Sequence, residues 1–168
     1  SICHKTLHVP SEVIRARQTG ECRWTGFAED NCWNTPDNWS SGTVPTDWDT
    51  VVFGSEMSAA LSGATISLGA TQGAKSIAVE TSGELTLGTA DDKSSGYALV
   101  AAHLVRSGEG AGQLVLTTPF VFSAADDGTN TLVSSAAVKF ADSCGSATGG
   151  VLRKTGAETV TLAGTLSG

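Results

Sequence analysis

Short runs of alternating apolar and polar residues fill the chain from residue 50 onward, and they restrict the possible folds more than any other feature. The runs are rich in Val, Leu, Ile, Thr and Ser, and stretches of Gly, Asn, Asp and Ser separate them. Alternation with a period of two is typical of half-buried strands bounded by turns. We therefore predict strands over residues 50–53, 64–68, 76–79, 84–87, 113–117, 120–122, 131–133, 136–140, 151–155 and 159–164.

This region contains no convincing helix. Residues 97–105 are its longest apolar-rich run, but they lack the polar face of a surface helix. The run is also shorter than the ~18–20 apolar residues of a membrane span, and His103 interrupts it. The sequence therefore predicts an all-β fold and no membrane span.

Two all-β architectures fit this pattern, a stacked β-helix and a β-sandwich. Sandwich cores usually contain several large aromatic side chains, whereas the predicted inward residues here are mainly Leu, Val, Ile and Ala. Narrow aliphatic strands with small turn residues favour the β-helix. We expect three parts: a polar N-terminal extension (1–22), a Trp-rich capping segment (23–54) and solenoid coils (55–168).

The charge balance excludes one class of partner. The 168 residues carry 17 acidic and 10 basic side chains, a formal net charge of −7, without a basic cluster. Binding to a phosphate backbone needs clustered Lys and Arg. We therefore expect no nucleic-acid partner.

Four cysteines form an even set without a C-x-x-C motif: Cys3, Cys22, Cys32 and Cys144. Their spacing matches no common zinc site, so we expect no metal and no other cofactor. Paired cysteines, few Lys and many Ser and Thr residues fit an exported protein. Three pairings are possible; we favour Cys22–Cys32, because these residues bracket Trp24 across a short loop, and this leaves Cys3 and Cys144 paired or free.

Two segments carry recognisable motifs. The first contains WTG at residues 24–26, CWNTPDNWSSGTVP at 32–45 and DTVVF at 49–53, and the second reads GVLRKTGAETVTLAG at 150–164. They resemble, in this order, the start of the passenger region and the repeat of bacterial surface proteins with autotransporter-associated β-strand repeats. Residues 64–88 are similar to the strands that usually lie between them. One departure is Glu158, which stands where the repeat usually has Gly.

The resemblance implies a right-handed parallel β-helix in an exported cell-surface protein, with no catalytic residues. The repeat is carried by Gly150, Leu152, Lys154, Gly156, Leu162 and Gly164. We expect Leu152, Val160 and Leu162 to point into a narrow interior. The three glycines would turn the chain with positive φ, and Lys154 would face solvent.

The tryptophans precede the coils, where a solenoid needs a cap for its first turn. We interpret the capping segment in this way. Its expected cap residues are Trp24, Trp33, Asn38, Trp39, Pro45 and Asp49. The alternative is carbohydrate binding, because exposed indole rings stack on sugar rings; the candidates for stacking are Trp48, which lies outside the family pattern, and Trp39.

No catalytic constellation emerges from the remaining polar residues. We interpret the acidic pairs at residues 91–92 and 126–127 as solvated turns, and His103 as a structural histidine. The sequence thus predicts a non-catalytic structural or adhesive β-solenoid at the cell surface or outside the cell. Its partner would be a neighbouring copy or further solenoid sequence. The alternative is a carbohydrate-binding or polysaccharide-acting β-helix module that recognises host or matrix glycans.

Overall fold

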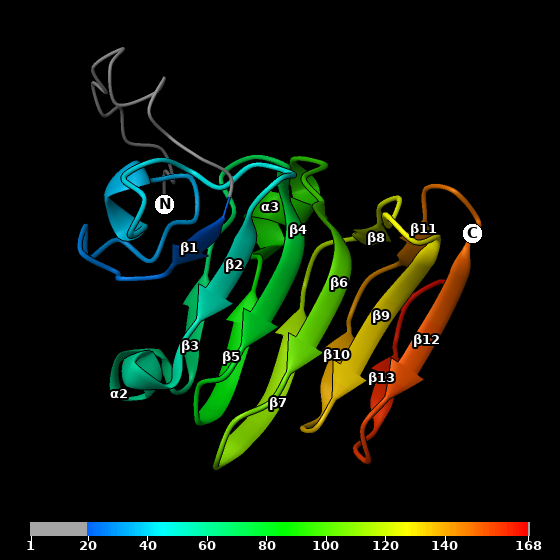
Figure 1. Cartoon of the computed structure of the whole chain (residues 1–168). Helices are drawn as coiled ribbons and strands as arrows, with labels where there is room; N and C mark the ends of the chain where they lie inside the picture. Colours follow the sequence, from blue (N-terminus) through cyan, green and yellow to red (C-terminus); the bar gives the residue numbers. More distant parts are fainter. Residues whose placement is uncertain (1–19, 168) are drawn as a thin grey trace.

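The computed structural model describes residues 20–167, whose strands form two sheets (Figure 1). The larger sheet contains β1 (Glu21–Arg23), β2 (Thr50–Phe53), β4 (Gln72–Val79), β6 (Leu99–Arg106), β8 (Phe120–Phe122), β9 (Thr129–Ser134), β11 (Cys144–Ser146) and β12 (Val151–Thr155). The smaller sheet contains β3 (Ala64–Ile66), β5 (Gly83–Leu87), β7 (Ala111–Leu116), β10 (Val138–Phe140) and β13 (Val160–Leu162). The prediction of a mainly β chain is confirmed.

All pairings between the named strands of residues 20–167 are parallel. The chain alternates between the sheets, since β4 lies in the larger one, β5 in the smaller one and β6 again beside β4. Sandwich domains usually pair their strands antiparallel, so this pairing differs from the β-sandwich alternative.

Regular register aligns the inward residues of successive strands in columns. In the smaller sheet one such column consists of Ile66, Leu87, Leu116, Phe140 and Leu162. Its first four members are almost fully buried between the sheets. Mainly aliphatic side chains thus stack from β3 to β13, which explains why few aromatic rings are needed in the coils.

The central strand β6 is absent from the strands predicted by sequence. Its inward residues are Leu99, Ala101 and Leu104, and two residues, Ala102 and His103, lie between the second and the third. The strict alternation of apolar and polar residues is therefore interrupted. The neighbouring strand β4 has the same interruption and aligns with β6 on both sides of it.

The helical segments are short. They are η1 (Pro36–Asn38), η2 (Ser55–Met57), α2 (Ser58–Leu61) and α3 (Ala90–Ser94). Helix α3 corrects the interpretation of residues 91–92 as a solvated turn, because Asp92 is 4% exposed. Its carboxylate accepts hydrogen bonds from the main-chain N–H groups of Leu68 (2.8 Å) and Thr89 (2.9 Å).

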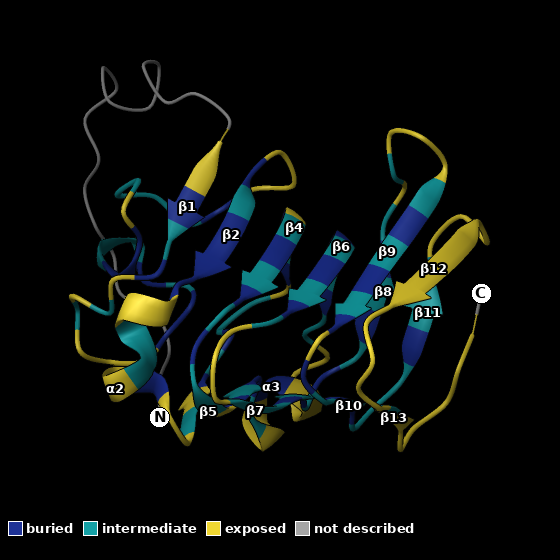
Figure 2. Ribbon diagram, turned by 60° about the horizontal axis from the view of Figure 1, so that its bottom comes forward, coloured by how far each residue is buried: buried dark blue, intermediate teal, exposed yellow. Residues whose placement is uncertain are grey.

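Exposure differs sharply at the C-terminal end, where β12 is exposed along its whole length (Figure 2). Leu152 and Leu162 align with the buried positions of the preceding coil, but they are 44% and 45% exposed. The prediction that they lie in the interior is therefore wrong in this structure, because β12 and β13 belong to the last coil that residues 20–167 form. Val160 is half-buried and Lys154 is exposed.

The glycines of the repeat have different roles. Gly156 has a φ of +91°, as the repeat predicts, whereas Gly150 and Gly164 are not in the positive-φ region. A Cβ atom at Gly164 would collide with the carbonyl group of Asp142. Close approach of two coils, rather than a left-handed turn, is therefore the reason for glycine at position 164.

Of the N-terminal extension expected at residues 1–22, the structure describes residues 20–22 alone. Within the described part of the chain, no helix has the length and apolar character needed to cross a membrane.

Candidate functional site

Three tryptophans and one phenylalanine form a compact cluster at the start of the coils. The rings of Trp24, Trp33, Trp39 and Phe53 have centroid separations of 5.0 to 5.8 Å where they contact one another. Several of these contacts are edge to face, an arrangement that aromatic quadrupoles favour. All four side chains are at most 3% exposed. The cluster therefore covers the apolar end of the first coil.

A polar network beneath the rings involves Asn38, which is fully buried. Its side-chain amide donates to Asp30 Oδ1 (2.6 Å) and to the carbonyl oxygen of Cys32 (2.8 Å). Its Oδ1 accepts a hydrogen bond from the main-chain N–H of Ala28 (2.9 Å). The expected cap residue Asn38 thus links one loop of the cap to another, and Asp30 is a member of this network that the motif did not indicate.

The cap also makes main-chain contacts at the outer edges of both sheets. The main-chain N–H of Ser40 donates to the carbonyl oxygen of Arg23 in β1 (2.9 Å). At the smaller sheet, Cys32 forms a parallel bridge with Ser67, whose N–H donates to Asn31 (2.9 Å). An edge strand with unoccupied main-chain groups is a template for pairing with another chain. At this end of the molecule, residues of the cap bond to some of these main-chain groups.

Trp39 and Trp48, the two candidates for carbohydrate stacking, lie in opposite environments. Trp39 is 3% exposed inside the cluster, so the proposal that it stacks on a ligand is wrong. Trp48 is 72% exposed and lies on a turn before β2. Pro45 and Asp49, also expected in the cap, are buried on either side of that turn.

The cysteines require a second correction. Cys22 is a buried thiol rather than half of a disulfide, so the predicted Cys22–Cys32 bond is wrong. The two residues lie in different elements: Cys22 in β1, whereas Cys32 bridges to the edge of the smaller sheet. Cys32 is disulfide-bonded, whereas Cys144 is a buried thiol; Cys3 lies outside the described residues.

Arg106 is a fully buried cation that sequence reasoning did not single out. Its guanidinium donates to four main-chain carbonyl oxygens: Val79 (3.3 Å), Thr81 (2.8 Å), Gly83 (2.6 Å) and Gly112 (3.1 Å). Burial lowers the pKa of Arg106 to about 10. Its hydrogen bonds join the connection between β4 and β5 to the start of β7, which indicates a structural role. A lone Arg at the end of an apolar run was the available sequence signal.

Trp48 lines a groove together with Asp47, Lys75 and Asp126. Lys75 and Asp126 form an ion pair of 3.0 Å between exposed side chains. These charged residues were not predicted to lie near Trp48, because they belong to a different strand and a distant loop. The acidic turn at residues 126–127 is exposed, as expected.

The C-terminal end contains a second hollow, of about 380 Å³. It lies between Leu152 and Leu166, with Phe122 and Cys144 among its other lining residues. Leu166 is 64% exposed and follows Cys144 in a column of aligned positions. Burial raises the pKa of the Cys144 thiol to about 11.

No group of three or more His, Cys, Asp or Glu side chains within residues 20–167 has the proximity needed to hold a metal ion. His103 contacts the hydroxyl of Thr131 through Nδ1 at 2.8 Å, on the outer face of the larger sheet. Comparisons with protein-family models, curated proteins and solved structures find no match. The resemblance to autotransporter-associated repeats therefore stays a prediction from the motifs.

Proposed function

We propose that the chain is a non-catalytic structural segment of an exported bacterial surface protein, folded as a right-handed parallel β-helix, and that it associates with a second copy through its open end. The observation that carries this proposal is the contrast between the ends. Cap residues bond to the main chain at the sheet edges at one end, whereas Leu152, Leu162 and Leu166 are exposed at the other.

The β-helix interpretation is supported by parallel pairing in both sheets and by the alternation of successive strands between them. Parallel connections of this kind are right-handed in the great majority of proteins. The repeat resemblance over residues 150–164 implies the same architecture. The interior columns, such as the one from Ile66 to Leu162, agree with coil-by-coil stacking.

The non-catalytic role is supported by how the buried polar side chains are used. Arg106, Asp92 and Asn38 direct their hydrogen bonds to main-chain groups of neighbouring turns or to cap residues. Such bonds hold coils together. The same residues are too deeply buried to meet a substrate.

The open end offers both backbone groups and apolar surface. In the described residues, β12 pairs on one side with β9, and β13 pairs on one side with β10. Lys154 stands in the column that contains Leu132, and its ammonium donates to the carbonyl oxygens of Gly156 (2.8 Å) and Glu158 (2.9 Å). This column therefore ends in an ammonium group at the open end. Leu152, Leu162 and Leu166 supply the apolar surface through which the second copy would bind.

The capped end restricts how two copies meet. Cap residues bond to the main chain at Arg23 of β1 and at Ser67 next to β3, so within the described residues the strand edges at the capped end are partly taken and pair less well with the open end of another copy. Two copies therefore join open end to open end, with the same patch on both partners. This arrangement closes on itself and gives a dimer rather than a filament.

Sedimentation velocity over a concentration series tests the proposal. We expect a reversible monomer–dimer equilibrium and no larger species. Leu162→Lys places a charge in the contact and should shift the chain to monomer. Phe27→Lys is the matched control, since Phe27 is 84% exposed at the capped end, and it should leave the equilibrium unchanged. A chain that stays monomeric at the highest concentration, or a dimer that Leu162→Lys leaves intact, would contradict association through the open end.

A further inference from the structure

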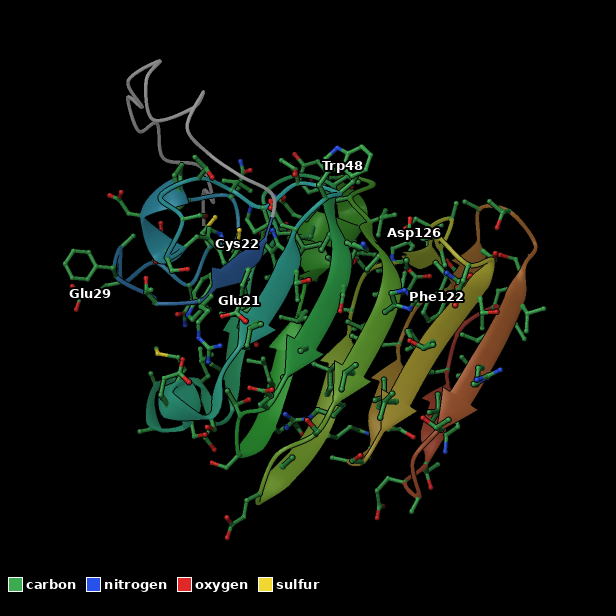
Figure 3. All side chains as sticks on the ribbon, viewed as in Figure 1. Glu21, Cys22, Glu29, Trp48, Phe122 and Asp126 are labelled. Carbon is green, nitrogen blue, oxygen red and sulfur yellow. The ribbon has the colours of Figure 1, made fainter. Side chains whose placement is uncertain are left out.

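A groove of about 330 Å³ crosses the outer face of the larger sheet. Trp48 lines one side, Asp126 lines the other, and both labelled side chains lie toward the same end of the sheet in Figure 3. The floor consists of Val100 and Ala102 from β6, whose side chains are small or aliphatic. The volume lies at the lower end of the ~300–1,000 Å³ that is typical of small-molecule sites.

Hydrogen bonds hold the backbone of the turn that carries Trp48. The carboxylate of Asp49 accepts a hydrogen bond from the N–H of Thr46 (2.8 Å), and the N–H of Asp49 donates back to the carbonyl oxygen of Thr46 (2.9 Å). The N–H of Lys75 then donates to the carbonyl oxygen of Asp49 (2.7 Å), which fastens the turn to β4. Because Asp49 is fully buried, the indole is presented to solvent from a fixed backbone.

The opposite side of the groove is also held in place. Asn130 is 2% exposed, and its amide donates to the carbonyl oxygens of Ala102 (3.0 Å) and Ser123 (2.7 Å). These bonds anchor the start of the loop that carries Asp126. The carboxylate of Asp126 pairs with the ammonium of Lys75 at 3.0 Å. A rigid binding site loses little conformational entropy when a ligand binds.

A further carboxylate lies against the strand beneath Trp48. A Cβ atom at Gly73 would collide with Oδ1 of Asp47. Glycine at this outward position of β4 therefore leaves the space that the carboxylate of Asp47 occupies. The groove then presents an indole face, the two carboxylates of Asp47 and Asp126, and one ammonium group from Lys75.

We infer that this groove binds a neutral glycan, with one pyranose ring stacked on Trp48. A pyranose has a face of C–H groups and a rim of hydroxyls. The electron-rich face of an indole attracts the C–H face, and the two carboxylates accept hydrogen bonds from the rim while Lys75 donates. Two negative charges against one positive charge disfavour uronate and sulfate groups. This inference goes beyond the proposed structural role and does not depend on association of the chain.

The test is to titrate the full chain with defined hexasaccharides. Calorimetry and tryptophan fluorescence measure the binding. The neutral probes are cellohexaose, xylohexaose, maltohexaose and chitohexaose, and the acidic probe is hexagalacturonate. We expect at least one neutral probe to bind with a Kd on the order of 1 mM, as an open groove that contacts one face of a sugar would give. Hexagalacturonate should bind at least tenfold more weakly.

Matched variants locate the binding. Trp48→Ala should weaken it at least tenfold, and Gly73→Ala should weaken it several-fold, because the added methyl displaces the carboxylate of Asp47. Phe27→Ala removes another exposed aromatic ring away from the groove and should leave the Kd unchanged. Amide NMR spectra of each variant check that the fold is retained. The inference is overturned if none of the neutral probes binds, if binding survives Trp48→Ala, or if hexagalacturonate binds as tightly as the neutral probes.

Discussion

The indole N–H of Trp39 donates a hydrogen bond of 2.8 Å to the main-chain carbonyl oxygen of Trp33, and the two rings meet edge to face with centroids 5.0 Å apart. Trp39 thereby buries a large apolar surface while its polar atom keeps a partner. The loop that carries Trp33 is tied to the loop that carries Trp39. This one contact explains why the ring belongs to the cap rather than to a ligand surface.

The first prediction concerns that contact. Trp39→Ala should lower the free energy of unfolding by ~3–5 kcal/mol, because a large buried ring leaves a cavity. Trp39→Phe keeps most of the apolar contact and leaves the carbonyl oxygen of Trp33 without this donor, so it should cost ~1–3 kcal/mol. Urea titrations measure both values. Trp48→Ala is the control, and its exposed ring predicts a change within ~0.5 kcal/mol; equal losses for Trp39 and Trp48 would contradict the assignment of the cap.

The second prediction concerns Arg106, whose guanidinium binds four carbonyl oxygens in the interior. Arg106→Met should cost about 3 kcal/mol or more, because several buried acceptors lose their donor. Arg106→Lys should recover only part of this loss, since a single ammonium group cannot match the planar fork of donors. Thermal unfolding of both variants shows which of them loses more stability.

The control for Arg106 is Arg153→Met, in the exposed strand β12. A surface change of this kind should alter the free energy of unfolding by no more than ~0.5 kcal/mol. If Arg106→Met were as mild as Arg153→Met, the structural role of the buried guanidinium would be wrong.

The third prediction concerns Asp92, the buried carboxylate of α3. It accepts hydrogen bonds from the N–H groups of Leu68 (2.8 Å), Gly69 (3.0 Å) and Thr89 (2.9 Å). Asp92→Ala should cost ~2–4 kcal/mol, because buried donors are left without an acceptor. Chemical denaturation is the measurement, with the exposed residue Glu84 as control. A loss for Asp92→Ala no larger than that for Glu84→Ala would show that the carboxylate does not hold this turn.

The fourth prediction concerns pH and Cys144, whose pKa burial raises from 9.0 to about 11. Between these two pH values the unfolded chain releases the thiol proton while the folded chain retains it. The free energy of unfolding should therefore fall as pH rises through this window. Cys144→Ala removes the titrating group, so its profile from about pH 9 to about pH 11 should be flatter than that of the natural chain. Parallel profiles for the two proteins would contradict burial of the thiol.

Several strands follow from local sequence alone. The predicted ranges 50–53, 120–122 and 151–155 coincide with β2, β8 and β12, because alternation with a period of two directly reflects the two faces of a strand. Strand β6 was not predicted, because its sequence does not alternate strictly between apolar and polar residues. Ala102 and His103 separate its inward residues and break the alternation, and only its place between β4 and β9 secures it as a strand.

The groove beside Trp48 illustrates what local patterns miss. Trp48, Lys75 and Asp126 come from three separate elements, and nothing in their immediate neighbourhoods indicates that they lie together. They meet because parallel stacking brings successive turns of the chain to the same side of the larger sheet. The sequence signal that was present, an exposed ring outside the family motif, pointed to Trp48 but not to its polar neighbours.

By itself, the sequence determined that the chain is mainly β, where most strands lie, and that an aromatic cluster precedes the coils. These properties depend on residue type and spacing within short segments. Tertiary structure alone decided which tryptophan is buried and which is exposed, that Cys22 is a thiol, and that Leu152 and Leu162 lie at an open end. The physical reason is that burial in a stacked fold depends on whether a neighbouring coil is present, and that neighbour comes from a distant part of the chain or from another molecule.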